Sequence, residues 1–131
     1  TSLVVLTMPE RPSPELAAAQ RFANSLRLAQ DRAILTGRPV GLQLGEGDYH
    51  FEDWQSSRWQ DVSGTYEALP ERTRLELLDG APERDEEDTV WPVLVFDPTG
   101  VVSEASFRLR GRQEYVEIRV ASSGEVALET R

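Results

Sequence analysis

Apolar residues recur at three- and four-residue steps between positions 14 and 36, which is the spacing of one face of an α-helix. This face comprises Leu16, Ala19, Phe22, Ala23, Leu26, Ala29 and Ala33. Ser13 is a typical N-cap, Pro14 suits the first helical position, and Gly37 suits the residue that follows the last turn. The pattern therefore predicts one amphipathic helix over residues 14–36.

A proline-rich lead-in, residues 1–14, precedes this helix. It begins with a short apolar run and then carries prolines at positions 9, 12 and 14, which break any helix entering from residues 1–6. The apolar run consists of Leu3, Val4, Val5 and Leu6. It is much shorter than the ~20 residues that a membrane span needs, and the start at Thr1 without methionine predicts a trimmed or processed form.

After Gly37 the apolar period changes to two, which is typical of β-strands. We predict strands over 40–44, 48–54, 58–62, 73–78, 91–96, 105–110, 115–120 and 126–129. The nearly continuous apolar run 91–96 favours a central strand. One helix followed only by strands indicates a single α+β domain over residues 1–131. Its helix should pack on one face of an antiparallel sheet or β-sandwich that spans residues 40–131.

The charge of the chain narrows the candidate functions. There are 23 acidic and 14 basic residues, a net charge of -9, and the chain has no cysteine and one histidine. The basic residues are all arginine, so lysine-based Schiff-base chemistry is excluded, as are thiolate metal sites and a cysteine nucleophile. An acidic chain gains nothing from counterion release on nucleic acid. Composition therefore favours an interaction domain, with no cofactor, over an enzyme.

The densest cluster of acidic side chains lies in a polar loop. It comprises Glu83, Asp85, Glu86, Glu87 and Asp88. Several carboxylates could bind calcium, but the spacing does not match an EF-hand loop, and no glycine lies within the run. We interpret it as a solvated loop, with a contact to a basic partner as the alternative.

Two further patterns, both on the hairpin around residues 48–59, could carry chemistry. His50 shares a strand side with Asp48 and Glu52, but no Gly-x-Ser-x-Gly motif is present, so we interpret His50 as a surface residue. The aromatic residues near it are Tyr49, Phe51, Trp54 and Trp59, which favour sheet packing over stacking on bases or sugars. A small hydrolase or sugar-binding module built on this hairpin is the weaker hypothesis.

Two surfaces could bind partners. Arg108, Arg110 and Arg112 share one strand face and could contact phosphates, but nearby glutamates favour a solvated strand of mixed charge. On the helix, Ala17, Leu28 and Leu35 share a side within the polar arc. These three are either scattered surface residues or a second contact stripe for a neighbouring helix.

Two segments resemble a known family. Residues 29–42, Ala-Gln-Asp-Arg-Ala-Ile-Leu-Thr-Gly-Arg-Pro-Val-Gly-Leu, resemble the helix-to-first-strand signature of the H-class minor pseudopilins of type II secretion. Residues 93–100, Val-Leu-Val-Phe-Asp-Pro-Thr-Gly, are similar to that family's strand and Pro-x-Gly turn. Minor pilins of type IV pili share the layout. The resemblance covers the whole chain in layout and implies a pilin-like fold.

The resemblance also implies a structural role. Such proteins have a hydrophobic N-terminal helix that anchors them in the bacterial inner membrane, are processed and methylated at the N-terminus, and place a β-rich domain in the periplasm. The resemblance implies that the lead-in 1–14 is a remnant of that helix, with residues 1–6 as its end. That domain lies at or near the tip of the pseudopilus, which exports folded proteins. The implied partners are the major pseudopilin and the tip-complex subunits, with the secretin or a secreted substrate as further candidates. The candidate contact residues are Ala17, Leu28, Leu35, residues 3–6 and the acidic loop.

The alternative is a minor pilin of type IV pili that acts in pilus assembly or DNA uptake. DNA uptake calls for a basic, arginine-rich end. Here the last residues, 125–131, read Glu-Val-Ala-Leu-Glu-Thr-Arg, and Gly111-Arg112 is at most half of the expected arginine motif. The charge pattern therefore favours the secretion hypothesis.

Overall fold

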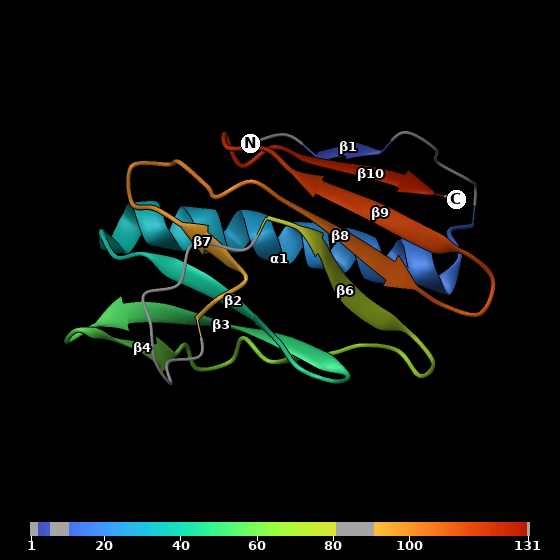
Figure 1. Cartoon of the computed structure of the whole chain (residues 1–131), viewed down its shortest axis with the longest axis horizontal. Coiled ribbons are helices and arrows are strands. Elements are labelled where there is room, and N and C mark those ends of the chain that lie inside the picture. The colour runs from blue at the N-terminus through green and yellow to red at the C-terminus, as the bar shows by residue number, and fades with distance from the viewer. Residues whose placement is uncertain (1–2, 6–10, 81–90, 131) are drawn as a thin grey trace.

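In the computed structural model, which describes residues 3–5, 11–80 and 91–130, one long helix crosses the molecule (Figure 1). This helix, α1, spans Pro14–Thr36. The Ser13 side chain accepts a hydrogen bond from the backbone N–H of Leu16 at 3.0 Å, and Gly37, at φ 70°, donates its N–H to the carbonyl of Ala33. Both predicted helix ends are confirmed. No helix in the described part of the chain is both long and apolar enough to cross a membrane.

The strands form two sheets. The first sheet has the order β1 (Leu3–Val5), β10 (Val126–Thr130), β9 (Tyr115–Val120), β8 (Ala105–Arg110) and β6 (Arg74–Asp79). The second has the order β4 (Arg58–Asp61), β3 (Asp48–Gln55), β2 (Val40–Leu44) and β7 (Leu94–Phe96), and β5 (Glu67–Ala68) also pairs with β3. All pairs are antiparallel except β1 with β10. The predicted α+β class is confirmed.

The prediction of a central strand over residues 91–96 is wrong, because β7 begins at Leu94 and lies at the edge of the second sheet. The run is apolar because the chain is covered on both faces there. Leu94 and Phe96 are fully buried. On the other side Pro92 packs against Gly41, where an added Cβ would come within 2.3 Å of Pro92 Cγ. The continuous apolar run therefore reflects contacts on both faces of this segment and does not indicate a central position in the sheet.

Residues 3–5 form strand β1 instead of the end of a helix. The strand runs parallel to β10, with Leu3 opposite Val126 and Val5 opposite Leu128. The edge of β10 supplies backbone hydrogen-bond partners, and the prolines that follow prevent a continuous helix into α1. Strand β5 was also missed, since two residues are too few to show a period.

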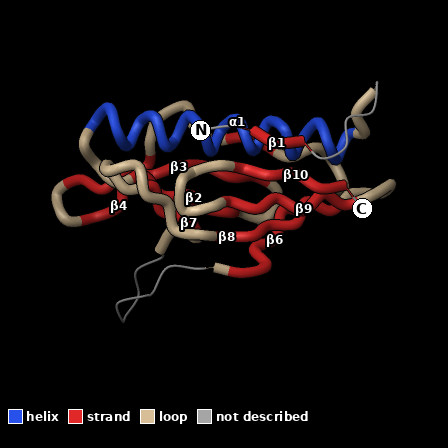
Figure 2. Tube along the Cα trace, turned by 90° about the horizontal axis from the view of Figure 1, so that it is seen from above, coloured by secondary structure: helices blue, strands red, loops and turns tan. Residues whose placement is uncertain are grey.

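The core lies between one face of α1 and both sheets, and α1 contacts β8, β9 and β10 as well as β2 and β7. Figure 2 shows the helix on one side and the strands other than β1 on the other. Phe22 lies at the junction, with its ring 5.0 Å from that of Tyr49 on β3 and 5.3 Å from that of Phe107 on β8. The predicted apolar face is confirmed, because every residue assigned to it is buried.

Two buried polar residues fix the position of α1 along the sheets. The carboxylate of Glu15 accepts hydrogen bonds from the backbone N–H groups of Gln113 and Glu114, each at 3.2 Å. Gln30 Nε2 donates to the carbonyls of Gly100 at 2.9 Å and Ser123 at 3.0 Å. The two sites are 15 residues apart on the helix, about 22 Å along its axis. Sliding the helix along the sheets would break the hydrogen bonds at both sites.

Replacing Gln30 with alanine should lower the free energy of unfolding by about 1–3 kcal/mol, because two loop carbonyls lose their shared donor. Urea unfolding followed by circular dichroism measures this change. Arg21→Ala, at an exposed position of the same helix, is the control and should stay within about 0.5 kcal/mol of wild type. Equal effects of the two substitutions would show that Gln30 does not fix the helix.

Candidate functional site

The polar side of α1 carries the apolar stripe that the sequence singled out. Leu28 and Leu35 are 57% and 85% exposed, and Ala17 is partly covered. Leu28 and Leu35 are seven residues apart, which places them about 10.5 Å apart along one side of the helix. We call Ala17, Leu28 and Leu35 the helix stripe. It lies opposite the buried face, so none of the three contributes to the helix–sheet core.

Two exposed apolar residues near the end of α1 were not singled out from the sequence. Ile34 is 51% exposed and lies close to Gly100, and Val101, the next residue along, is 58% exposed. Ile34 falls at the margin of the buried face, where the apolar period predicts partial burial. Its exposure depends on where the sheets end beneath the helix, which the sequence does not reveal.

A cleft of about 420 Å³ opens beside Leu28, between α1 and the segment 62–67. Its lining includes Arg32, Phe51 and Val62. Arg32 Nη2 lies 3.3 Å from Asp53 Oδ2, and Asp53, which is 1% exposed, also accepts a hydrogen bond from Gln55 at 2.7 Å. This ion pair fastens the helix to β3 at the cleft. The helix stripe therefore has a concave, partly polar surface next to its central residue.

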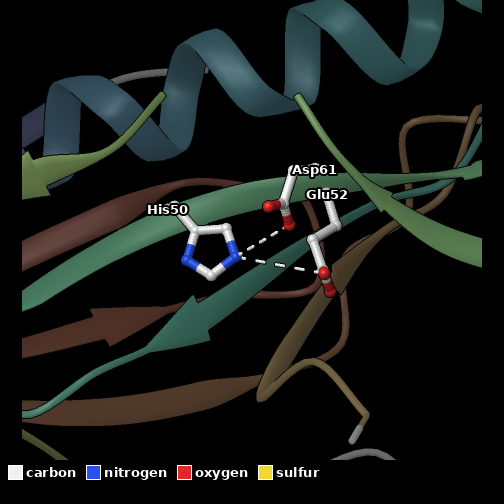
Figure 3. Close-up of side chains that lie close together, drawn as sticks. All are labelled: His50, Glu52 and Asp61. Atoms are coloured by element: carbon white, nitrogen blue, oxygen red, sulfur yellow. Dashed lines mark ion pairs between the residues drawn. The ribbon is translucent and has the colours of Figure 1, made fainter. Parts of the chain in front are cut away.

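His50 lies among carboxylates from two strands (Figure 3). Its Nε2 atom is 3.9 Å from Glu52 Oε2 on β3 and 3.3 Å from Asp61 Oδ1 on β4. Burial raises the pKa of the Glu52 carboxyl, and its hydrogen bond from Gln43 opposes that rise. Among the described residues, Glu52 and Asp61 form the ion pairs of His50, so the suggested Asp48 partner is replaced by Asp61 from the neighbouring strand.

The aromatic hairpin divides between two faces of its sheet. Tyr49 and Phe51 are buried in the core, while Trp54 and Trp59 pack with Trp91 at centroid distances of 5.3–6.1 Å. The prediction that these aromatics serve packing is confirmed for Tyr49 and Phe51. The hairpin does not present its aromatics as one stacking surface for bases or sugars.

The positive charges of the arginines on β8 are compensated by glutamates on the neighbouring strands. Arg108 Nη2 lies 3.4 Å from Glu117 Oε1, and Arg110 Nη2 lies 3.7 Å from Glu76 Oε2. The guanidinium of Arg108 also lies over the ring of Tyr115, 4.6 Å from its centroid. The interpretation as a strand of mixed charge is confirmed for these two arginines.

The remaining candidate contact residues lie outside the part of the chain that the structure describes. They are Glu83, Asp85, Glu86, Glu87, Asp88 and Leu6.

The arrangement of one capped helix across two mainly antiparallel sheets defines a pilin-like fold. A family profile described as type II transport protein GspH matches residues 18–124, so the chain belongs to the GspH family of type II secretion minor pseudopilins. Its members are structural proteins without catalytic activity. Comparison with curated protein sequences gives no significant match.

Solved structures agree on the fold. The minor pseudopilin EpsH of the Vibrio cholerae type 2 secretion system is 20% identical, with a TM-score of 0.71, and the match covers 89% of this chain and 97% of that one. A crystal structure of V. cholerae EpsH gives a TM-score of 0.69 at 20% identity, and the match covers 88% of this chain and 92% of that one. The solution structure of E. coli GspH gives a TM-score of 0.65 at 22% identity, and the match covers 90% of this chain and 87% of that one.

The helix stripe should be dispensable for folding. Leu35→Glu should change the free energy of unfolding by less than about 0.5 kcal/mol, because the side chain is 85% exposed. Leu26→Glu, on the buried face of the same helix, should lower it by more than about 4 kcal/mol or abolish folding, because it buries an unpaired charge. Denaturant unfolding of both variants tests this. A large loss in Leu35→Glu would assign that residue to the core.

Proposed function

We propose that this protein is a structural subunit at or near the tip of the type II secretion pseudopilus and that it binds other pseudopilins through the helix stripe. Membership of the GspH family supports a place in the secretion system. The observation that carries the proposed contact is the exposure of Leu28 and Leu35 on the side of α1 that faces away from both sheets. Family membership also supports an inner-membrane anchor before this domain and a periplasmic location for the domain itself.

The partner that fits the stripe is an apolar face of a helix from another pseudopilin. Side chains seven residues apart form a straight row, which a second helix can pack against along its length. Burying two leucines contributes roughly 1.5–3 kcal/mol each, which favours assembly. The adjoining cleft offers space for one large side chain of the partner.

The acidic loop remains a second candidate contact, with a basic partner surface as its expected complement. Residues 3–6 are a third candidate, of which residues 3–5 form β1. A secretin or a secreted substrate is the expected partner for loops, which vary more freely than the helix–sheet scaffold. These contacts are independent of the helix stripe and need separate tests.

The assembly role predicts that the domain binds a preformed complex of the other tip pseudopilins, and that Leu28→Glu combined with Leu35→Glu weakens this binding at least tenfold. Pull-down against each pseudopilin ectodomain, alone and as the complex, measures it. Leu78→Glu is the matched control, because Leu78 is 44% exposed but lies on β6, away from α1. Unchanged binding by the folded double variant would rule out the helix stripe as the contact.

The alternative of a DNA-uptake pilin predicts different behaviour. With a net charge of -9 and two arginines of β8 paired with glutamates, we expect no mobility shift of DNA at near-physiological ionic strength. Measuring the shift over a range of salt concentrations distinguishes the two functions. A shift that weakens steeply with salt would favour the pilus alternative.

A further inference from the structure

We propose that His50, Glu52 and Asp61 form a binding site for a divalent transition-metal ion of the zinc class on the β3–β4 hairpin. The imidazole nitrogen and one oxygen from each carboxylate lie within 4.8 Å of one another. Ligands of a tetrahedral zinc ion, at about 2.0–2.2 Å from the metal, are separated by roughly 3.4 Å. The distance from His50 Nε2 to Asp61 Oδ1 is already 3.3 Å, so small side-chain rotations would complete the site.

The free carboxylate oxygens are oriented by neighbours. Gln43 Nε2 donates to Glu52 Oε1 at 2.9 Å, and the other oxygen, Oε2, faces His50. The Tyr66 hydroxyl donates to Asp61 Oδ2 at 3.4 Å, and Oδ1 faces His50. Each carboxylate thus has one oxygen held by a donor and one directed at the same nitrogen. Outer hydrogen bonds of this kind fix the orientation of metal ligands.

The imidazole is also held in place. Its ring stacks on Tyr66, with centroids 4.2 Å apart and planes 7° apart. The side chains of His50 and Glu52 are only 15% and 14% exposed, whereas Asp61 is 56% exposed. Two ligands are therefore shielded, and the third lies at an open mouth through which an ion can enter.

Strand register gives an independent reason to expect a cation here. Glu52 and Asp61 are directly opposite each other in the antiparallel β3–β4 pair. Like charges in directly opposite positions destabilise a strand pair. A divalent ion between them would offset two negative charges and join the two strands.

The ligand types favour zinc over calcium or magnesium. Calcium and magnesium select all-oxygen sites with six or more ligands, whereas imidazole nitrogen combined with carboxylate oxygen suits Zn²⁺ and its neighbours. Three protein ligands leave a fourth position for water or for a donor from a partner. The site goes beyond the assembly role proposed above and does not depend on it.

Calorimetric titration of the tag-free chain with Zn²⁺ tests the site. We expect one saturable site in the wild-type protein and at least a tenfold loss of affinity in His50→Ala and in Asp61→Asn. Glu46→Gln removes the same charge from the exposed β2–β3 turn and should bind as wild type within twofold. Circular dichroism confirms that each variant is folded. Equal binding by His50→Ala would overturn the proposal.

A second measurement needs no variant. His50 is the only histidine, so its imidazole resonances are unambiguous in a nuclear magnetic resonance spectrum. Zn²⁺ should shift these resonances and fix the imidazole as a single tautomer bound through Nε2. Resonances that stay unchanged at Zn²⁺ concentrations that saturate any calorimetric binding would place that binding elsewhere and reject the site.

Discussion

The burial of one face of α1 against two sheets at once is the interaction on which the rest of the structure depends. Phe22 contacts an aromatic ring from each sheet, so the helix side chains form the common core of β strands that otherwise belong to separate sheets. Glu15 and Gln30 then hold the helix at two positions along its length. The apolar face provides the attraction, and the two polar residues provide the register.

Because the buried face and these two polar residues hold α1 in place, the fold does not dictate which residues occupy the opposite side of the helix. Because the core needs only the buried face, exposed leucines at positions 28 and 35 are not required by the fold. Large apolar side chains at such exposure are common singly, and a spaced pair on one helix side is the feature that favours a partner. The cleft beside Leu28 and the ion pair of Arg32 with Asp53 give that side a defined shape.

Local signals predicted local structure well. The cap at Ser13, the period of the apolar face and Gly37 fixed both ends of α1 in the sequence, and alternation located most strands. Features that depend on register or distant pairing were not predicted. Residues 3–5 become a strand only because β10 is available 123 residues later, and β7 lies at an edge despite its apolar run.

The group formed by His50, Glu52 and Asp61 shows the same limit of prediction from sequence. Glu52 could be paired with His50 from the period of a single strand, but Asp61 reaches His50 only through the turn and register of the β3–β4 hairpin. A single sequence does not fix that register, because a one-residue slip would turn Asp61 to the other face. The candidate surface on α1 was accessible to prediction because it needs only the helical period.

The hydrogen bonds of Glu15 also constrain how the chain reaches its final structure. Their partners lie 98 and 99 positions further along, in the loop between β8 and β9, so a helix made early in synthesis is completed by a segment made much later. Contacts of such sequence separation slow folding. Until β8, β9 and β10 exist, the apolar face of α1 has no complete surface to cover it and is open to wrong association. A chain shortened at its C-terminus would therefore endanger the first helix as much as the last strand.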